Sequence, residues 1–251
     1  MLFTLPETKI FQEITHIPVA FNTTNIGDDI QSEAACRLFD KRCYVNRDDV
    51  SNWPKNSLIP MIGWYSHGYF CNKRDVLFIS FHLQDETMIR VSKDKKILNW
   101  MKSQIKNQKF PALCRDIHTR DFLRDMKIDA EFGGCITSTL KSRGFNRDKL
   151  LAIDVEKSED YKNYSYESNV SHLLPTMTPE QRIFQACKRI DLYDQSIKVI
   201  TSRLHAYIPC LALGVDVELL YNQVTFQPQR FTGHITDEKC SSNSLVFNPN
   251  S

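Results

Sequence analysis

The sequence lacks long apolar runs and any marked excess of charge of one sign. No stretch approaches about 18 consecutive apolar residues, so we expect no membrane-spanning helix. Lys and Arg total 32 against 30 Asp and Glu, a formal net charge of +2, which disfavours a large basic surface and hence a nucleic-acid partner. The first residues carry no basic segment and include Glu7 and Glu13, which argues against a secretory signal peptide.

Paired-cysteine motifs are also missing. The chain has eight cysteines, but no two form a Cys-x-x-Cys motif, and most lie within apolar segments. This pattern is typical of reduced, buried thiols rather than of a disulfide framework or a zinc site. The histidines are scattered without the spacing of metal ligands. We therefore expect a cytoplasmic protein with no metal and no cofactor.

Short β-rich apolar runs alternate with helical patterns along the chain. This alternation predicts βαβ units around largely parallel sheets, which is the α/β fold class. A chain of 251 residues with 41% apolar content can form one large or two small domains. The basic, Gly-containing segment 141–149 has the composition of a linker, so we expect domains at residues 1–143 and 144–251.

The expected elements follow from hydrophobic periodicity. We expect strands at residues 17–21, 43–45, 58–64, 76–81, 110–114 and 150–155, a Gly-broken strand and turn at 131–140, one strand ending at 200 and one beginning at 215. Helices are expected at 30–39, from Ser92, from Thr119 and after Thr178, where Pro179 and Gln181 complete a capping box. The Tyr-rich segment 156–170 is expected to be a surface loop, and the chain beyond about residue 223 to be irregular.

The segment from residue 197 to 221 carries the strongest functional signal. A strand ends at Ile200, and Arg203 and His205 follow in an apolar helix that contains Pro209 and ends before Gly214. Open α/β sheets bind ligands at the carboxyl ends of their strands, Arg binds phosphate or carboxylate, and His exchanges a proton near neutral pH. Because Pro209 has no N–H, we also expect a kink at His205. The alternative is an Arg paired with a carboxylate and a His held in the core.

Two other strand ends carry candidate residues. Arg115 follows the strand at 110–114, and Asp116 or Thr119 is placed to cap the next helix, whose N-terminus favours an anion. Arg115 is therefore either a second cation at the same ligand or an ordinary surface arginine. The turn from Asn25 to Asp29 holds two carboxylates, which suits a general base acting on a sugar hydroxyl better than a phosphate site. Here Asp28 is the candidate base, and the alternative is a simple helix cap by Asp28 or Asp29.

Aromatic and polar side chains also follow the strand at 58–64. Trp64 suits the C–H face of a sugar, and His67 suits hydrogen bonding to its hydroxyls. Alternatively, Trp64 is a core residue whose polar tip is satisfied.

These segments together resemble those of the polysaccharide pyruvyl transferase family. The matching pieces, which span about residues 17 to 222, are Asn25–Asp28, Ile62–Tyr65, Cys114–Asp116 with Thr119, residues 133–137, and Thr201–Gly214 followed by Val217. The resemblance implies two Rossmann-like halves facing a cleft, as in GT-B glycosyltransferases, in a compact version. The chain departs from the family in being short and in carrying Asp216 where a proline often stands.

The resemblance implies that a pyruvyl group passes from phosphoenolpyruvate to a sugar of a polysaccharide or glycan precursor. A ketal forms across two hydroxyls and phosphate is released. Arg203, the backbone of Leu204, and Arg115 would bind the donor. From the chemistry we assign protonation of the donor to His205 and activation of the hydroxyl to Asp28, with Asn25, Trp64 and His67 binding substrate. The alternatives are a GT-B-like glycosyltransferase that uses a nucleotide sugar and a non-catalytic glycan-binding protein.

Overall fold

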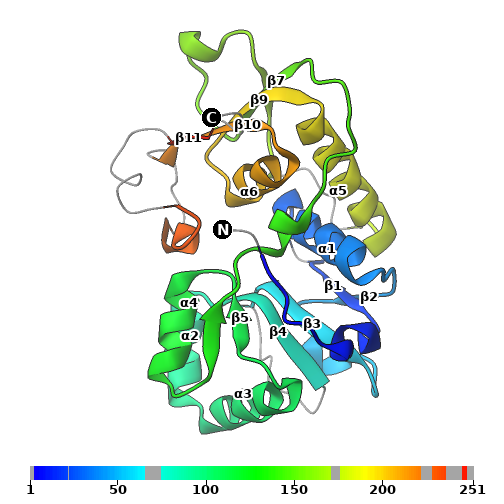
Figure 1. Cartoon of the computed structure of the whole chain (residues 1–251), viewed down its shortest axis with the longest axis vertical. Coiled ribbons are helices and arrows are strands. Elements are labelled where there is room, and N and C mark those ends of the chain that lie inside the picture. The colour runs from blue at the N-terminus through cyan, green and yellow to red at the C-terminus, as the bar shows by residue number, and fades with distance from the viewer. Residues whose placement is uncertain are drawn as a thin grey trace. The chain divides into compact units, whose positions relative to one another are not determined.

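The computed structural model describes residues 3–21, 23–65, 75–170, 176–221, 228–235 and 245–247. The chain divides into two compact units (Figure 1). Unit 1 comprises Met1–Asn22 and Ala35–Ile136, and unit 2 comprises Thr23–Ala34 and Thr137–Ser251. Each unit is a Rossmann-like α/β half built on a parallel sheet, which confirms the α/β class expected from the alternation of strands and helices.

Unit 1 has a parallel sheet of order β3-β4-β5-β6 and a parallel pair β1-β2. The Thr15 N–H donates to the carbonyl of Leu58 at 3.0 Å, which joins the chain before β1 to the start of β3. The strands are β1 (Ile17–Val19), β2 (Tyr44–Asn46), β3 (Leu58–Trp64), β4 (Asp75–His82), β5 (Ala112–Cys114) and β6 (Ala130–Phe132), and the helices are α2 (Asp85–Lys93), α3 (Lys95–Gln108) and α4 (Ile117–Asp125).

The helix expected to begin at Ser92 begins at Lys95 as α3, and a helix that we did not expect, α2, precedes it. Asp94 ends α2 and caps α3, because its carboxylate accepts from the backbone N–H groups of Lys96 and Ile97. The apolar face expected of this helix is present, with Ile97 and Met101 fully buried in the core. Sequence periodicity found the buried stripe, which lies wholly within α3, but it missed α2 and the cap at Asp94 that separates the two helices.

Unit 2 has a sheet of order β11-β10-β9-β7-β8, in which only the β10–β11 pair is antiparallel. Helices α5 and α6 pack against each other and against β9, and α6 also packs against β10 (Figure 1). The strands are β7 (Lys149–Ile153), β8 (Ser165–Glu167), β9 (Ser196–Thr201), β10 (Asp216–Leu219) and β11 (Leu245–Phe247), and the helices are α5 (Pro179–Asp194), α6 (Leu204–Leu213) and the first turns of α1 (Ile26–Phe39).

Two expectations for unit 2 were wrong. The segment 156–170 is not only a loop, because Ser165–Glu167 forms β8 at one side of β7. The chain beyond residue 223 also contains a strand, β11, which pairs with β10. Both strands have three residues, and their pairing with a neighbouring strand rather than their own pattern defines them.

The sheet order of unit 2 creates a topological switch point. From β7 the chain passes to β8 on one side, and it then returns to place β9 on the other side. In such sheets the two connections diverge above the carboxyl ends of the central strands and leave a crevice there. In unit 2 this position lies after Ile153 of β7 and Thr201 of β9.

Several local predictions in unit 2 are confirmed. Thr178 forms the capping box with Gln181, and Pro179 stands in the first turn of α5. Gly214 ends α6 in the left-handed conformation, with φ of 68°. The kink expected from Pro209 is present at His205, whose φ and ψ of −88° and 22° are not helical.

The first helix begins earlier than expected. Asn25 precedes α1, and its Oδ1 accepts from the N–H of Gly27 at 2.9 Å, so Asn25 performs the capping that we had expected of Asp28 or Asp29. Both aspartates instead lie in the first turn of α1, where their charge favours the helix dipole.

A buried ion pair holds the start of α1 in unit 2. Arg182 of α5 donates from Nε to Asp29 Oδ1 and from Nη2 to Asp29 Oδ2, both at 3.0 Å, and neither side chain is exposed. The same Nη2 donates to the Thr23 carbonyl at 2.8 Å. This bidentate contact explains why residues 23–34 belong to unit 2, although the sequence analysis placed all of 1–143 in one domain.

The segment expected to be a linker also belongs to unit 2. Ser142 donates to Asp194 Oδ1 at 2.7 Å, and Arg147 Nη2 donates to the Leu213 carbonyl at 2.6 Å. These contacts join residues 142–147 to the ends of α5 and α6. In the part of the chain that the structure describes, no helix has both the length and the apolar character needed to cross a bilayer.

We expect Arg182→Ala to lower the free energy of unfolding by about 3–5 kcal/mol, because it leaves the Asp29 carboxylate buried without its cation. Urea denaturation measures this loss. Arg143→Ala is the matched control, since Arg143 is half exposed and its pair with Asp191 is worth at most about 1 kcal/mol. Equal effects of the two substitutions would contradict a special role for the buried pair.

Candidate functional site

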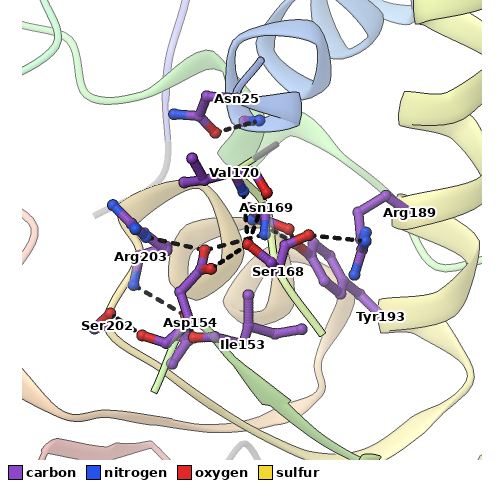
Figure 2. Close-up of polar contacts among 12 residues, drawn as sticks. Asn25, Ile153, Asp154, Ser168, Asn169, Val170, Arg189, Tyr193, Ser202 and Arg203 are labelled. Carbon is purple, nitrogen blue, oxygen red and sulfur yellow. Dashed lines mark hydrogen bonds and ion pairs between the residues drawn. The ribbon is translucent and has the colours of Figure 1, made fainter. Parts of the chain in front are cut away.

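An ion pair occupies the switch point of unit 2. Asp154 follows β7 directly, and Arg203 follows β9. Arg203 Nε donates to Asp154 Oδ2 at 3.0 Å, and Figure 2 shows the two side chains pointing toward each other. The Arg203 side chain is 34% exposed, against 10% for Asp154. The cation at this sheet edge is therefore both held and accessible.

The Asp154 carboxylate accepts two further hydrogen bonds from the segment after β8. Ser168 Oγ donates to Oδ1 at 2.5 Å, and the Asn169 N–H donates to Oδ2 at 3.0 Å (Figure 2). The backbone of Asp154 is also fixed, since its N–H donates to the Glu167 carbonyl and its own carbonyl accepts from Ser202 Oγ. Asp154 thus joins the ends of three strands, and we call Asp154, Ser168, Asn169 and Arg203 the switch-point cluster.

His205 lies beside the first turn of α1, within the same unit. It is 7% exposed. A Cβ placed on Gly27 would meet His205 Cβ at 3.0 Å and His205 Nδ1 at 3.2 Å, so only glycine allows this approach. The absence of a side chain at residue 27 is therefore what brings the imidazole against the N-terminus of α1.

The side-chain amide of Gln31 contacts His205. Gln31 Nε2 lies 3.4 Å from His205 Nδ1, 3.4 Å from Asp28 Oδ1 and 3.5 Å from the Gly27 carbonyl. The amide nitrogen carries two hydrogens, so it cannot donate to all three atoms at once. These contacts hold the imidazole beside the first turn of α1, and they do not determine which ring nitrogen carries a proton.

The structure brings most of the predicted site residues together in unit 2. Arg203, Leu204 and His205 lie at the start of α6, and Asn25 and Asp28 lie at the start of α1. The side chain of Leu204 is buried, so any contact with a ligand falls to its backbone. The Asn25 side chain is engaged in capping α1, and Asp28 is 7% exposed, with one oxygen beside Gln31.

Two of the other predicted site residues, Arg115 and Trp64, belong to unit 1. Arg115 follows β5, and Trp64 is the last residue of β3, in register with His82 of β4. His67 lies outside the described residues.

Arg115 is part of a buried polar cluster in unit 1. It is fully buried, and its Nε lies 3.9 Å from Asp116 Oδ2, so the alternative of a surface arginine is wrong. Asp116 also lies 2.6 Å from His82 Nδ1, and its Oδ1 accepts from the Thr119 N–H at 2.8 Å, which makes Asp116 the cap of α4. Burial opposes the charge on Asp116, but His82, Arg115 and the Thr119 amide outweigh it and lower its pKa.

Sequence reasoning missed Asp154 and its supports Ser168 and Asn169. The Asn169 side chain hydrogen-bonds Tyr193 Oη on α5, and burial raises the pKa of Tyr193, so its hydroxyl keeps its proton. The available signal was the carboxylate directly after the apolar run Leu150–Ile153, at the carboxyl end of a strand, as Arg203 is.

The described cysteines agree with the expectation of reduced thiols. Six are free, and Cys36, Cys114, Cys135 and Cys210 are buried. Burial raises the pKa of the Cys114 and Cys210 thiols, so both are poor nucleophiles near neutral pH.

Comparisons with known proteins show no family for this chain. No protein-family model matches the chain, and no curated protein matches it in sequence. A solved structure of an uncharacterized protein from Klebsiella pneumoniae is similar, with a TM-score of 0.43 and 12% sequence identity over 83% of this chain and 84% of that one. This likeness carries no assignment of function.

We expect Gly27→Ala to lower stability and to move His205 away from the start of α1. The new Cβ displaces His205, at a cost of about 1–3 kcal/mol, offset by up to about 1 kcal/mol from better helix propensity. Gly214→Ala is the matched control, because its strain comes only from φ and its Cβ would meet nothing within 4 Å. Urea denaturation should show a loss of stability for both variants, whereas the imidazole resonances of His205 in NMR spectra should shift only in Gly27→Ala.

Proposed function

We propose that the protein transfers a pyruvyl group from phosphoenolpyruvate to a sugar of a polysaccharide or glycan precursor. The observation that carries the proposal is the accessible guanidinium of Arg203 at the switch point, two residues before His205 at the kink of α6. A cation beside a proton donor matches a small anionic donor that must be protonated to react.

The chemistry divides between the two residues and the acceptor. Arg203 binds the carboxylate or phosphate of the donor. His205, in its imidazolium form, gives a proton to the methylene carbon and becomes neutral, and a sugar hydroxyl adds to C2 while Asp28 receives the hydroxyl proton. A second hydroxyl of the sugar then displaces phosphate from C2, and its proton leaves with the phosphate. The ketal is then complete, and the proton held by Asp28 returns to His205 through solvent.

The finer architecture is part of the same proposal. As in GT-B-like enzymes, the two Rossmann-like halves would face a cleft, with the donor on unit 2 and the acceptor on unit 1. Arg115 would then supply a second cation to the donor. Because Arg115 is fully buried beside Asp116, this part of the proposal requires its guanidinium to become accessible when the donor binds.

Labelled phosphoenolpyruvate offered with a panel of hexosides and nucleotide sugars tests the proposal. We expect phosphate release that depends on the acceptor, and a ketal product detected by mass spectrometry. Nucleotide release from a sugar nucleotide would instead favour a glycosyltransferase. Sugar binding without donor binding in calorimetry would favour a glycan-binding protein.

A further inference from the structure

We infer that Asp154 is a positioning residue, which holds the Arg203 guanidinium in the plane that presents its terminal nitrogens to the donor. The inference rests on the proposed function and extends it to a residue that the motif around Arg203 does not contain. The group that Arg203 binds is a pair of oxygen atoms, from either a carboxylate or a phosphate.

Asp154 hydrogen-bonds only one of the three guanidinium nitrogens of Arg203, namely Nε. A guanidinium is planar, with five N–H donors in fixed directions, so fixing one of them fixes the others. Asp154 Oδ2 takes the Nε–H, and no described residue hydrogen-bonds the terminal nitrogens. With the side chain 34% exposed, those nitrogens remain as a fork for an incoming anion.

Asp154 is itself held in place. Its φ of 49° is left-handed, a conformation that aspartate and asparagine adopt more readily than most residues. Three donors from two segments converge on its two oxygens, namely Ser168 Oγ, the Asn169 N–H and Arg203 Nε (Figure 2). A carboxylate held in this way is a fixed reference point rather than a mobile surface charge.

The switch-point cluster is also connected to the helix that contacts His205. The Asn169 carbonyl accepts from the Ile26 N–H at 2.9 Å, at the first residue of α1. The same helix carries Gly27 and Gln31, which contact His205. The segment after β8 therefore supports the Asp154 carboxylate and also holds the start of the helix against which the imidazole lies.

The negative charge of Asp154 and its hydrogen bond to Arg203 have opposite effects on the binding of an anion. A carboxylate beside Arg203 weakens the attraction of the site for an anion, whereas its hydrogen bond orients the cation. Asp154→Asn and Asp154→Ala remove the same charge, but only asparagine keeps an oxygen that can accept from Nε. The ratio of the affinities of the two variants for phosphoenolpyruvate therefore measures how much the orientation of the Arg203 guanidinium contributes to binding.

The test is calorimetry with phosphoenolpyruvate on the full chain. We expect Asp154→Ala to bind at least about tenfold more weakly than Asp154→Asn. In an Arg203→Gln background the two substitutions should bind alike, since there is no guanidinium to orient. Equal affinities with Arg203 present would overturn the inference and leave the proposed function standing.

A second measurement needs no donor. The Nε–H resonance of Arg203, assigned in nitrogen-15 spectra by its loss in Arg203→Lys, should report a rigid group in the unaltered chain and in Asp154→Asn, and a mobile one in Asp154→Ala. A mobile Nε–H in the unaltered chain overturns the inference. A rigid Nε–H without any binding of phosphoenolpyruvate overturns the proposed function alone. Gly214→Ala, destabilised elsewhere in unit 2, should retain a rigid Nε–H.

Discussion

His205→Ala lowers turnover of phosphoenolpyruvate by about 10²–10⁴-fold and leaves donor affinity within about threefold of the unaltered chain; this is the largest effect we expect. The reason is that a positioned general acid contributes a factor of this size to the rate, while binding of the donor rests on Arg203. The proton that His205 would deliver is lost with the ring. Single-turnover kinetics combined with calorimetry separates the two quantities.

The control for this variant is His118→Ala. His118 lies on α4 in unit 1, where its partly exposed ring contacts Asp85 at 2.7 Å. Its loss should leave turnover unchanged. Full turnover in His205→Ala would remove the acid role from His205, and equal losses in the two variants would point to a general loss of activity instead.

Arg203→Ala raises the dissociation constant of phosphoenolpyruvate about 10- to 100-fold. Hydrogen bonds to a charged group contribute about 1.5–3 kcal/mol, and 1.4 kcal/mol is a factor of ten in affinity. The contribution is expected at this level because the guanidinium is oriented by Asp154 but still reaches solvent. Arg203→Lys should fall between, since it keeps the charge and loses the planar fork.

The two variants are distinguished by how their losses divide. Arg203→Ala should act mainly on affinity, and His205→Ala mainly on turnover. Titration calorimetry and initial rates at saturating donor show this division. If Arg203→Ala binds the donor as tightly as the unaltered chain, the anion is not held at the switch point, and the alternative reading of Arg203 as a purely structural partner of Asp154 gains support.

Much of unit 2 could be predicted because its signals are local. The kink at His205 follows from Pro209 four residues later, and the capping box of Thr178 with Gln181 spans one turn. Gly214 closes α6 because only glycine adopts its left-handed conformation without strain. Each of these features depends on groups within a few residues, so each can be inferred without knowing the rest of the fold.

The site itself could be predicted only in part. The position of Arg203 after a strand was clear, and the weighed alternative that it pairs with a carboxylate is also correct. What could not be foreseen is which carboxylate. Asp154 lies 49 positions earlier in the chain, and it reaches Arg203 because β7 and β9 are neighbours in the sheet.

The sequence by itself determined the α/β alternation, the main strands and helices, and the presence of Arg203 and His205 after a strand, since periodicity, caps and prolines act over a turn or less. The tertiary structure alone decided that residues 23–34 join unit 2, that β8 lies beside β7, and that Asp154 holds Arg203. Those outcomes depend on the order of strands in a sheet and on a buried pair, Arg182 with Asp29, 153 positions apart. Contacts between distant segments form only when the whole fold brings them together, so no local pattern encodes them.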